Sequence, residues 1–387
     1  MDAHYGIYLI TVLIASPIAV LLLTVHGDGF IKKIPLYHSF EIYLKHMFVI
    51  VLMMLFYILV LVFTGFRPFD AGFDTGRYIL AFEALDGITT AQSVGKEVYG
   101  NSEIGFWPVA AVIKIFIEDP RLWLVVNVSL IYILIGSLYK MLVRGTPAPF
   151  YIFVFVFLTY DMVYFGNAMR QSLGLPVAIM SLYFLTRGER VKYLLVLGVA
   201  ISLHWSSLAF LLAPIISWVI QWPRKYLLIF YALLPFFSKL MIETGYLISM
   251  TLGLDPLIDR FNIYMNKEDS HIVEAYYLYN FWLVVAFGLF VIVYVEKFRR
   301  YKMLYLAHSL LLFLVLSGVA IGDISERYFP GYIMLMPLIA YMAIFKVASY
   351  SRTVESRMIA SSLYFCAFAV LGLMVISSQS TRITLGY

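Results

Sequence analysis

The chain alternates long apolar runs with short polar connections over nearly its whole length. A membrane-spanning helix needs roughly 17–25 apolar residues, and a broken helix buried among other helices can be shorter. The pattern therefore predicts an all-α polytopic membrane protein with about twelve transmembrane helices, built as a single integral membrane domain over residues 1–387. The expected crossings lie near 5–26, 43–64, 122–139, 147–165, 171–186, 193–203, 206–221, 226–242, 276–295, 303–321, 329–346 and 358–377.

The two runs on either side of His204 are too short to be ordinary spans. They fit a hairpin of half-helices buried among others, or one long bent helix. Either arrangement puts a histidine at a helix break, next to hydrocarbon.

Composition supports a membrane environment. Hydrophobic residues make up 62% of the chain and charged residues only 13%, against about 45–50% and about 25% in soluble domains. The mean hydropathy is +0.88. The single cysteine, Cys366, excludes an intrachain disulfide and a cysteine metal cluster. The net charge of +5 is explained by topology, so no nucleic-acid partner is expected.

Orientation follows from the basic residues, which gather in alternate short connections and mark these as cytoplasmic. The connections 65–104 and 243–275 are acidic, with six acids against three bases and six against two, so they are expected outside, with both termini. A crossing at 105–118 would invert the pattern downstream, so this segment is interpreted as an amphipathic or re-entrant helix, which extends the first outer loop to 65–121. The cytoplasmic connections contain Lys32/Lys33, Lys140/Arg144, Arg187/Arg190/Lys192, Arg224/Lys225, Lys297/Arg299/Arg300/Lys302 and Lys346/Arg352/Arg357.

With this topology, unusual polar residues from distant parts of the chain all fall at the outer interface. Ionisable groups at membrane depth are costly, so they are functional candidates by default. Their coincidence on one side is the main argument for a site there. The segments are 72–78, 101–106, the helix start at Arg170, the break at His204, and 323–328.

Three arginines among these residues suit a phosphate-bearing ligand. The planar guanidinium donates paired hydrogen bonds and keeps its charge, so Arg77, Arg170 and Arg327 could together hold a pyrophosphate. Two of them could instead pair with a neighbouring carboxylate, Arg77 with Asp74 or Arg327 with Glu326. Arg170 has no acid nearer than nine residues in the sequence.

His204 is a candidate general base, because an unperturbed imidazole has a pKa of about 6.5. It could alternatively donate a structural hydrogen bond to a backbone carbonyl at the helix break. Glu103 competes for the role of base, and carboxylates also bind sugar hydroxyls. Asp74 fits a helix cap or turn between two glycines. The sequence has no Asp-x-Asp, HExxH or paired-cysteine motif and no glycine-rich phosphate loop, so we expect neither a metal site nor a cofactor.

These motifs resemble the EpsG-like family of bacterial polysaccharide polymerases, relatives of the Wzy polymerases. The likeness spans residues 65–210, and Glu326-Arg327-Tyr328 extends it toward the C-terminus. The segments that carry it are Gly72-Phe73-Asp74-Thr75-Gly76-Arg77-Tyr78, Glu103-Ile104-Gly105-Phe106, Asn167-Ala168-Met169-Arg170-Gln171-Ser172, Arg187-Gly188 and His204-Trp205-Ser206-Ser207.

The resemblance implies a helical membrane glycosyltransferase of the GT-C type. Such a polymerase would join oligosaccharide repeat units linked to undecaprenyl pyrophosphate, as in O-antigen or exopolysaccharide synthesis, at the periplasmic or outer face of the bacterial inner membrane. Besides donor, acceptor and membrane lipids, a chain-length regulator is an expected partner. The roles this implies are catalytic for His204, Glu103 and Arg170, and pyrophosphate or sugar binding for Arg77, Arg327, Asp74, Gln171 and Tyr328.

Other functions remain open on the sequence. A related enzyme could ligate a finished glycan to lipid A core or to protein. A transporter of lipid-linked sugars would need charges along a cavity from face to face, whereas the unusual charges here gather on the outer side and no halfway repeat is visible. A membrane acyltransferase could use a buried histidine, but the arginines would then have no obvious role.

Overall fold

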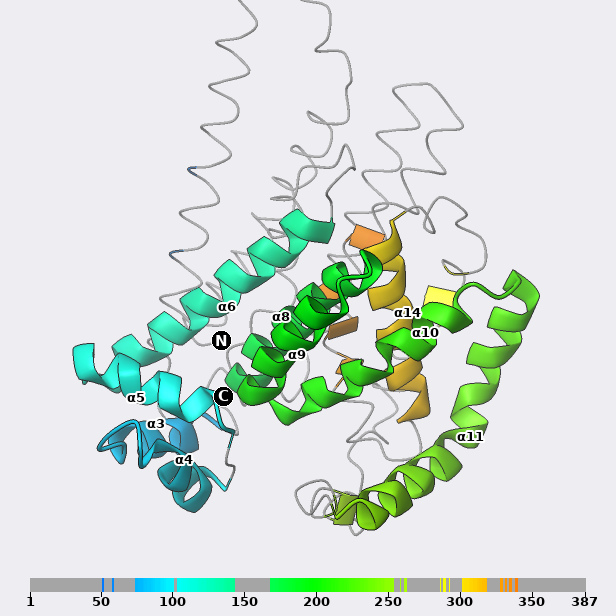
Figure 1. Ribbon diagram of the computed structural model, residues 1–387. Helices are drawn as coiled ribbons and strands as arrows, with labels where there is room; N and C mark the ends of the chain where they lie inside the picture. Colours follow the sequence, from blue (N-terminus) through cyan, green and yellow to red (C-terminus); the bar gives the residue numbers. More distant parts are fainter. Residues whose placement is uncertain are drawn as a thin grey trace, which may run out of the picture. The chain divides into compact units, whose positions relative to one another are not determined.

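The computed structural model describes residues 74–100, 103–142, 168–253 and 301–318, with single residues or pairs elsewhere between 51 and 339. Every regular element in these ranges is a helix, and they contain no strand, as expected for an all-α protein. The elements (Figure 1) are α3 (Thr75–Glu83), α4 (Ala91–Val94), the π-helix η2 (Gly95–Tyr99), α5 (Phe106–Phe116), α6 (Pro120–Leu142), α8 (Met169–Thr186), α9 (Arg190–Leu203), the 3₁₀-helix η3 (Trp205–Leu212), α10 (Ala213–Val219), α11 (Arg224–Thr251) and α14 (Lys302–Ser317).

The chain divides into two compact units. Unit 1 comprises Met1–Ala178, Gly198–Ser207 and Ala340–Tyr387, and unit 2 comprises Ile179–Leu197 and Leu208–Ile339. Helices α8 and α9 each contribute one end to unit 1 and the other to unit 2. The single integral membrane domain expected from the sequence stays a prediction.

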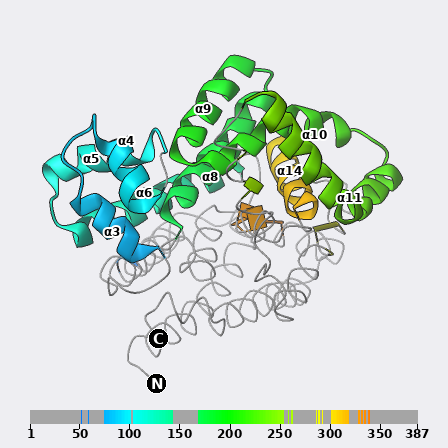
Figure 2. The same cartoon turned by 90° about the horizontal axis from the view of Figure 1, so that it is seen from below.

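The segment expected as the first outer loop, 65–121, contains the helices α3, α4, η2 and α5. These helices lie together in Figure 2, around an aromatic core in unit 1. Tyr78, Phe82, Trp107 and Trp123 are buried there, and the rings of Phe82 and Trp123 stack with centroids 4.5 Å apart. Such aromatic pairs bury large areas in specific geometry, so this part of the chain has a core of its own.

Helix α5 confirms the helix expected at 105–118. Its 11 residues rise about 16 Å at 1.5 Å per residue, about half the thickness of the hydrocarbon core. Its Lys114 Nζ donates hydrogen bonds of 2.7 Å to the carbonyl oxygens of Glu83 and Leu85. Carbonyls at a helix C-terminus carry partial negative charge and lack intrahelical donors, so this lysine ties α5 to the end of α3.

Two helices in the described ranges, α6 and α11, are long and apolar enough to cross a membrane, judged by length and composition. With 23 and 28 residues they rise about 35 and 42 Å, against a hydrocarbon core of about 30 Å. The expected spans 122–139 and 226–242 lie on them. Six of the other expected spans lie wholly or largely outside the described residues, so the total of about twelve and the GT-C arrangement stay predictions.

The end expected for the helix at 226–242 was wrong, because α11 continues to Thr251. The outer loop predicted from residue 243 therefore begins after this helix. A single charge at Glu243 does not end a helix when apolar residues continue beyond it. The helix ends instead just before Gly253, whose φ of +64° is left-handed, a conformation favoured by glycine after helix C-termini.

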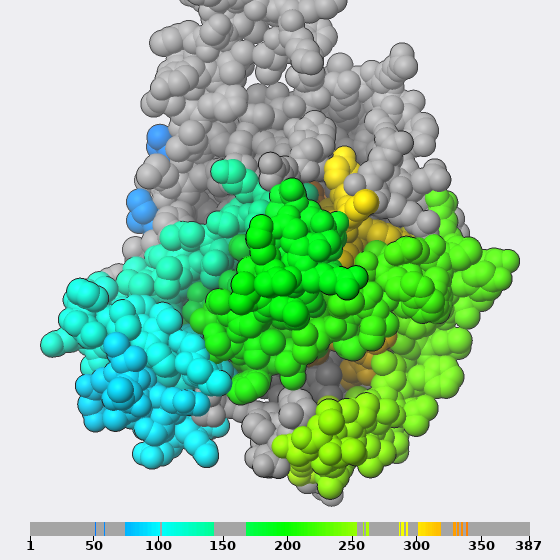
Figure 3. All heavy atoms as spheres, in the orientation of Figure 1, coloured from blue at the N-terminus to red at the C-terminus, as the bar shows by residue number. Residues whose placement is uncertain are grey.

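Helix α11 contains Pro235, and Figure 1 shows the helix bent. A proline inside a helix removes a hydrogen bond and clashes with the preceding turn, which bends the helix. Part of α11 lies on the surface in Figure 3, and Phe236 of this helix is 83% exposed. Large exposed apolar side chains on a helix of this length are expected where lipid is the solvent.

The basic turn between α8 and α9 has the backbone of a Schellman motif. The N–H of Glu189 donates to the carbonyl of Phe184 at 2.9 Å, and that of Gly188 donates to Leu185 at 3.0 Å. Gly188 has a φ of +77°, which is why a glycine occupies this position.

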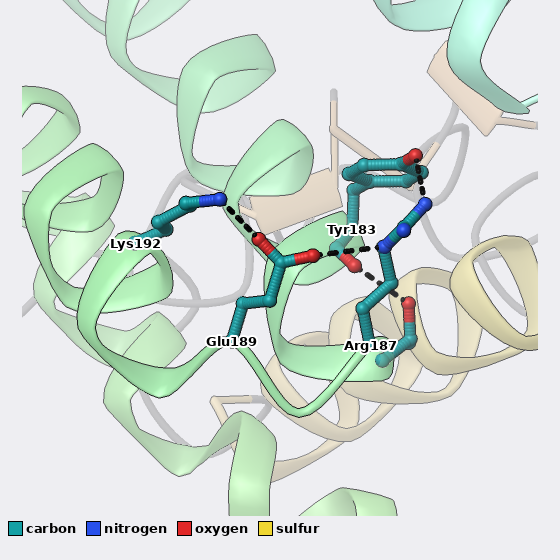
Figure 4. Close-up of polar contacts among 5 residues, drawn as sticks. Tyr183, Arg187, Glu189 and Lys192 are labelled. Atoms are coloured by element: carbon teal, nitrogen blue, oxygen red, sulfur yellow. Dashed lines mark hydrogen bonds and ion pairs between the residues drawn. The ribbon is translucent and has the colours of Figure 1, made fainter.

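Side chains of this turn pair at its surface (Figure 4). Arg187 donates to Glu189 at 2.9 Å and to the hydroxyl of Tyr183 at 2.7 Å, and Lys192 donates to the other oxygen of Glu189 at 2.7 Å. The cations are exposed, so these pairs contribute little to stability. The turn is organised by its backbone.

The core of unit 2 forms where α14 packs against α10 and α11. Tyr231 of α11 donates to the carbonyl of Ser309 at 3.1 Å. His308, buried in α14, has Nε2 at 3.2 Å from the carbonyl oxygen of Gly288, and its ring stacks on Tyr332 with centroids 5.2 Å apart. These contacts agree with a structural role for His308.

Candidate functional site

His204 lies at an interruption between two helices, as expected from the short runs around it. Its N–H donates to the carbonyl of Ala200 at 2.9 Å and completes the last turn of α9. Its own carbonyl accepts the N–H of Ser207 at 3.0 Å, the tighter pattern that opens η3. The helix is therefore not continuous through His204.

A backbone hydrogen bond holds the segment of Glu103 against the end of α9. The N–H of Gly105 donates to the carbonyl of Ser202 at 2.8 Å. A Cβ at position 105 would lie 2.5 Å from the Ser202 hydroxyl oxygen, so only glycine allows this approach. Glu103 precedes this bond by two residues and His204 follows it by two, and Oε1 of Glu103 lies 3.4 Å from Nδ1 of His204.

Helix α8 approaches the same turn through Gly174. A Cβ there would lie 3.0 Å from the Cβ of His204 and 3.2 Å from the hydroxyl oxygen of Ser207. Residues four apart share one face of a helix. Arg170 is four residues before Gly174, so α8 presents its arginine on the face that packs on His204.

The guanidinium of Arg170 is enclosed by three side chains. Nη1 lies 2.5 Å from Oε1 of Glu103, and Nε donates to the hydroxyl of Tyr78 at 3.1 Å. The ring of Tyr99 lies against the guanidinium, 4.1 Å from Cζ to the ring centroid. Arg170 is 6% exposed and Glu103 1% exposed. We call Glu103, Tyr78 and Tyr99 the arginine cage.

The charges in this cluster stabilise one another. Burial by itself raises the pKa of Glu103, but the nearby imidazole of His204 and the charge of Arg170 outweigh it and lower the pKa to about 2. Burial raises the pKa of Tyr99 far above its usual range, so the phenol is neutral. The second oxygen of Glu103, Oε2, is buried and has no hydrogen-bond partner within the described ranges.

A model of the EpsG family matches residues 50–385. The chain belongs to the EpsG family. The resemblance inferred from the motifs is thereby confirmed, and no curated protein or solved structure gives a match. Membership in the EpsG family indicates a polymerase-like role of glycosyltransferase type in polysaccharide synthesis, and together with the apolar helices it indicates a membrane protein.

In this EpsG-family chain, the three expected catalytic residues, Glu103, Arg170 and His204, come together within unit 1. The acid that pairs with Arg170 lies 67 residues away in the sequence. No acid lies close to Arg170 in the sequence, so this partner, which comes from another segment, was not predicted.

The residues expected to bind pyrophosphate or sugar belong to different elements of the chain. Arg77 is exposed on α3 and forms no ion pair with a described residue, so the alternative pairing with Asp74 is not found. Asp74 occupies the N-cap position of α3, as a cap or turn would predict, but its side chain makes no capping hydrogen bond. Gln171 is buried beside Arg170 on α8. Tyr328 is half-buried in unit 2, and Arg327 lies outside the described residues.

Tyr78 and Tyr99 received no role from the sequence. Tyr78 belongs to a motif of the EpsG resemblance, and Tyr99 ends a π-helix followed by Gly100 with a φ of +86°. A π-helix often marks a functional position, but it is hard to read from sequence. With 30 tyrosines in the chain, a partner for one arginine cannot be chosen without the fold.

The cluster contains one carboxylate (Glu103), one imidazole (His204), one guanidinium (Arg170) and two phenol side chains, those of Tyr78 and Tyr99. Within the described ranges, no group of three or more His, Cys, Asp or Glu side chains is positioned to hold a metal ion. The chemistry that the described residues themselves can supply is proton transfer and charge stabilisation.

Proposed function

We propose that this protein is a polysaccharide polymerase that joins oligosaccharide repeat units carried on undecaprenyl pyrophosphate. The reaction takes place at the periplasmic or outer face of the bacterial inner membrane, with the lipid pyrophosphate as leaving group. The observation that carries the proposal is a buried cluster in a chain of the EpsG family, in which the carboxylate of Glu103 contacts both Arg170 and His204.

The reaction needs a base. A hydroxyl of the acceptor unit attacks the anomeric carbon of the donor, a new C–O bond forms, and the bond to the pyrophosphate oxygen breaks. His204 takes the hydroxyl proton at Nε2, the ring nitrogen opposite Nδ1. Glu103, 3.4 Å from Nδ1, holds the ring and stabilises the imidazolium that forms, as a carboxylate does in a Ser-His-Asp triad.

The departing lipid pyrophosphate needs cationic partners, because negative charge builds on it as the bond breaks. Arg77 is exposed on α3 in unit 1 and is the arginine suited to this task, with Arg327 as the second candidate. Guanidinium groups bind phosphate oxygens in paired hydrogen bonds. Asp74, Gln171 and Tyr328 are assigned to sugar or pyrophosphate contacts in the same proposal.

The test is a reconstituted reaction. Purified protein in nanodiscs is mixed with a lipid-pyrophosphate-linked oligosaccharide, with chelator and without nucleotide. The expected result is a ladder of products spaced by one repeat unit, which His204→Gln abolishes. His308→Gln is the matched control, because it removes a buried histidine from unit 2 rather than from the site.

Three outcomes contradict the proposal. One is a folded wild-type protein that leaves the correct substrate unchanged, in which case a change of membrane leaflet would be measured next and would indicate a transporter. Another is a His204→Gln variant that polymerises at the wild-type rate, which would remove the proposed base. The third is transfer of the glycan to lipid A core or protein instead of to another repeat unit, which would indicate a ligase.

A further inference from the structure

We propose that Arg170 is a positioning residue, which holds Glu103 against His204 and does not bind the pyrophosphate leaving group. This inference rests on the proposed function, in which His204 is the base. It departs from the sequence-based expectation that Arg77, Arg170 and Arg327 form one phosphate site.

The first argument is that the guanidinium is already occupied. The guanidinium of Arg170 contacts Glu103 at 2.5 Å, the hydroxyl of Tyr78 at 3.1 Å and the ring face of Tyr99 at 4.1 Å. A pyrophosphate could reach it only if this cage opened. Opening would leave the carboxylate of Glu103 buried without its partner, which is costly.

The second argument is the geometry of one oxygen atom. Oε1 of Glu103 faces both Nη1 of Arg170 and Nδ1 of His204, at 2.5 and 3.4 Å. A buried carboxyl without a cation tends to take up a proton. The positive charge of Arg170 therefore keeps Glu103 ionised and its oxygen directed at the histidine, where a carboxylate orients the ring.

The third argument concerns the tyrosines, which hold the arginine in turn. A guanidinium on the face of an aromatic ring is attracted by the ring's quadrupole, and the Tyr78 hydroxyl accepts the Nε–H. Both tyrosines belong to the segment 75–99, in α3 and η2. Tyr78 and Tyr99 thus hold Arg170 in place. Arg170 in turn holds Glu103, which orients His204.

The experiment separates catalysis from binding in the reconstituted polymerase. Arg170→Gln and Glu103→Gln are each expected to lower kcat by roughly 10²–10⁴-fold, with the KM for the lipid-linked donor within about 3-fold of wild type. The double variant should be no worse than the poorer single variant, because residues that act as one unit are not additive. Arg77→Gln should instead raise KM.

A pH profile provides a readout that a purely structural role would not move. Without Arg170, the buried carboxyl of Glu103 takes up its proton at higher pH, so the kcat profile of Arg170→Gln should show a loss of activity from Glu103 protonation that the wild-type profile lacks at the same pH. Arg170→Lys keeps the charge and should reverse part of that change, but a lysine cannot reproduce the separate contacts of Nη1 with Glu103 and of Nε with Tyr78.

If Arg170→Gln fails to fold, variants of Tyr99, which belongs to the arginine cage, test whether Arg170 acts as a positioning residue. Tyr99→Leu removes the ring face, whereas Tyr99→Phe keeps it, so Tyr99→Phe should retain at least about ten times the kcat of Tyr99→Leu at similar KM. Equal kcat values for these two variants would show that the ring of Tyr99 does not hold Arg170 in position.

The positioning role is wrong if Arg170→Gln mainly raises KM and its effect adds to that of Glu103→Gln, because both results indicate direct contact with the donor. This outcome differs from failure of the proposed function, in which the wild-type protein forms no polymer. A polymerising wild type with additive variants would therefore reject only the positioning role.

Discussion

The backbone N–H of Gly105 donates a 2.8 Å hydrogen bond to the carbonyl oxygen of Ser202, and Glu103 and His204 each lie two residues from this bond. The bond connects the loop after η2 to the last turn of α9, within unit 1. Its length and position explain how a carboxylate and an imidazole from distant segments meet at 3.4 Å.

Gly105→Ala should therefore reduce polymerisation by at least about ten-fold, because the new methyl group would lie 2.5 Å from the Ser202 hydroxyl oxygen and 3.1 Å from its backbone carbonyl carbon. Small displacements of catalytic groups have large effects on rate. The rate of the reconstituted reaction is the measurement. Gly136→Ala is the control, since nothing lies within 4 Å of a Cβ at that position. Equal rates in the two variants would contradict the prediction.

Gly174→Ala should destabilise the protein by about 1–3 kcal/mol, the usual cost of overpacking. The added methyl would lie 3.0 Å from the Cβ of His204 and 3.1 Å from the backbone oxygen of Ala200. Thermal unfolding in nanodiscs measures the effect. A Cβ at Gly198 meets nothing within 4 Å, so Gly198→Ala should be neutral or stabilising. If Gly174→Ala were as stable as Gly198→Ala, the predicted close packing of α8 on the His204 turn would be contradicted.

The stability that Glu103 contributes should depend on pH in a defined direction. Its pKa is lowered to about 2 in the folded protein, from about 4.5 for a free carboxyl. A lowered pKa gives stability that is complete above the unfolded value and is lost as pH falls through the folded value. The difference in unfolding temperature between wild type and Glu103→Gln should thus be largest near neutral pH and shrink between pH 4.5 and 2.

The lowered pKa of Glu103 also has a consequence for the pH dependence of activity. Because the pKa of Glu103 is about 2, its carboxyl is ionised throughout the range of ordinary assays, and an acid limb above pH 4 in the wild-type profile belongs to another group. A stability difference that stayed constant down to pH 3 would show that Glu103 is not held in its charged form.

Lys114→Met should loosen the contact between α5 and α3. The lysine donates two hydrogen bonds of 2.7 Å to carbonyl oxygens at the end of α3. A hydrogen bond to a charged group contributes about 1.5–3 kcal/mol when it is shielded from water, and an exposed one contributes less. We expect a lower unfolding temperature and faster proteolysis of the 74–116 segment. Lys114→Arg keeps the charge and is the control. Equal proteolysis of both variants would mean that the two bonds do not hold these helices together.

Several features of this protein were readable from the sequence alone. The apolar runs predicted α6, α8 and the helix at 105–118, and they predicted a break at His204, because hydrophobic periodicity and length are local properties of the chain. Ionisable residues next to apolar runs drew attention to Glu103, Arg170 and His204, since such residues are costly there. The motifs around them led to the EpsG family.

Only the tertiary structure decided how these residues are used. Arg170 pairs with Glu103 and Tyr78 across 67 and 92 residues of sequence, and its cage closes on Tyr99, which no local pattern singled out. Such contacts depend on how helices pack, and packing here depends on close approaches at Gly105 and Gly174. The residue types made a cluster of charged residues predictable, but the helix packing decided that the arginine is buried against the acid.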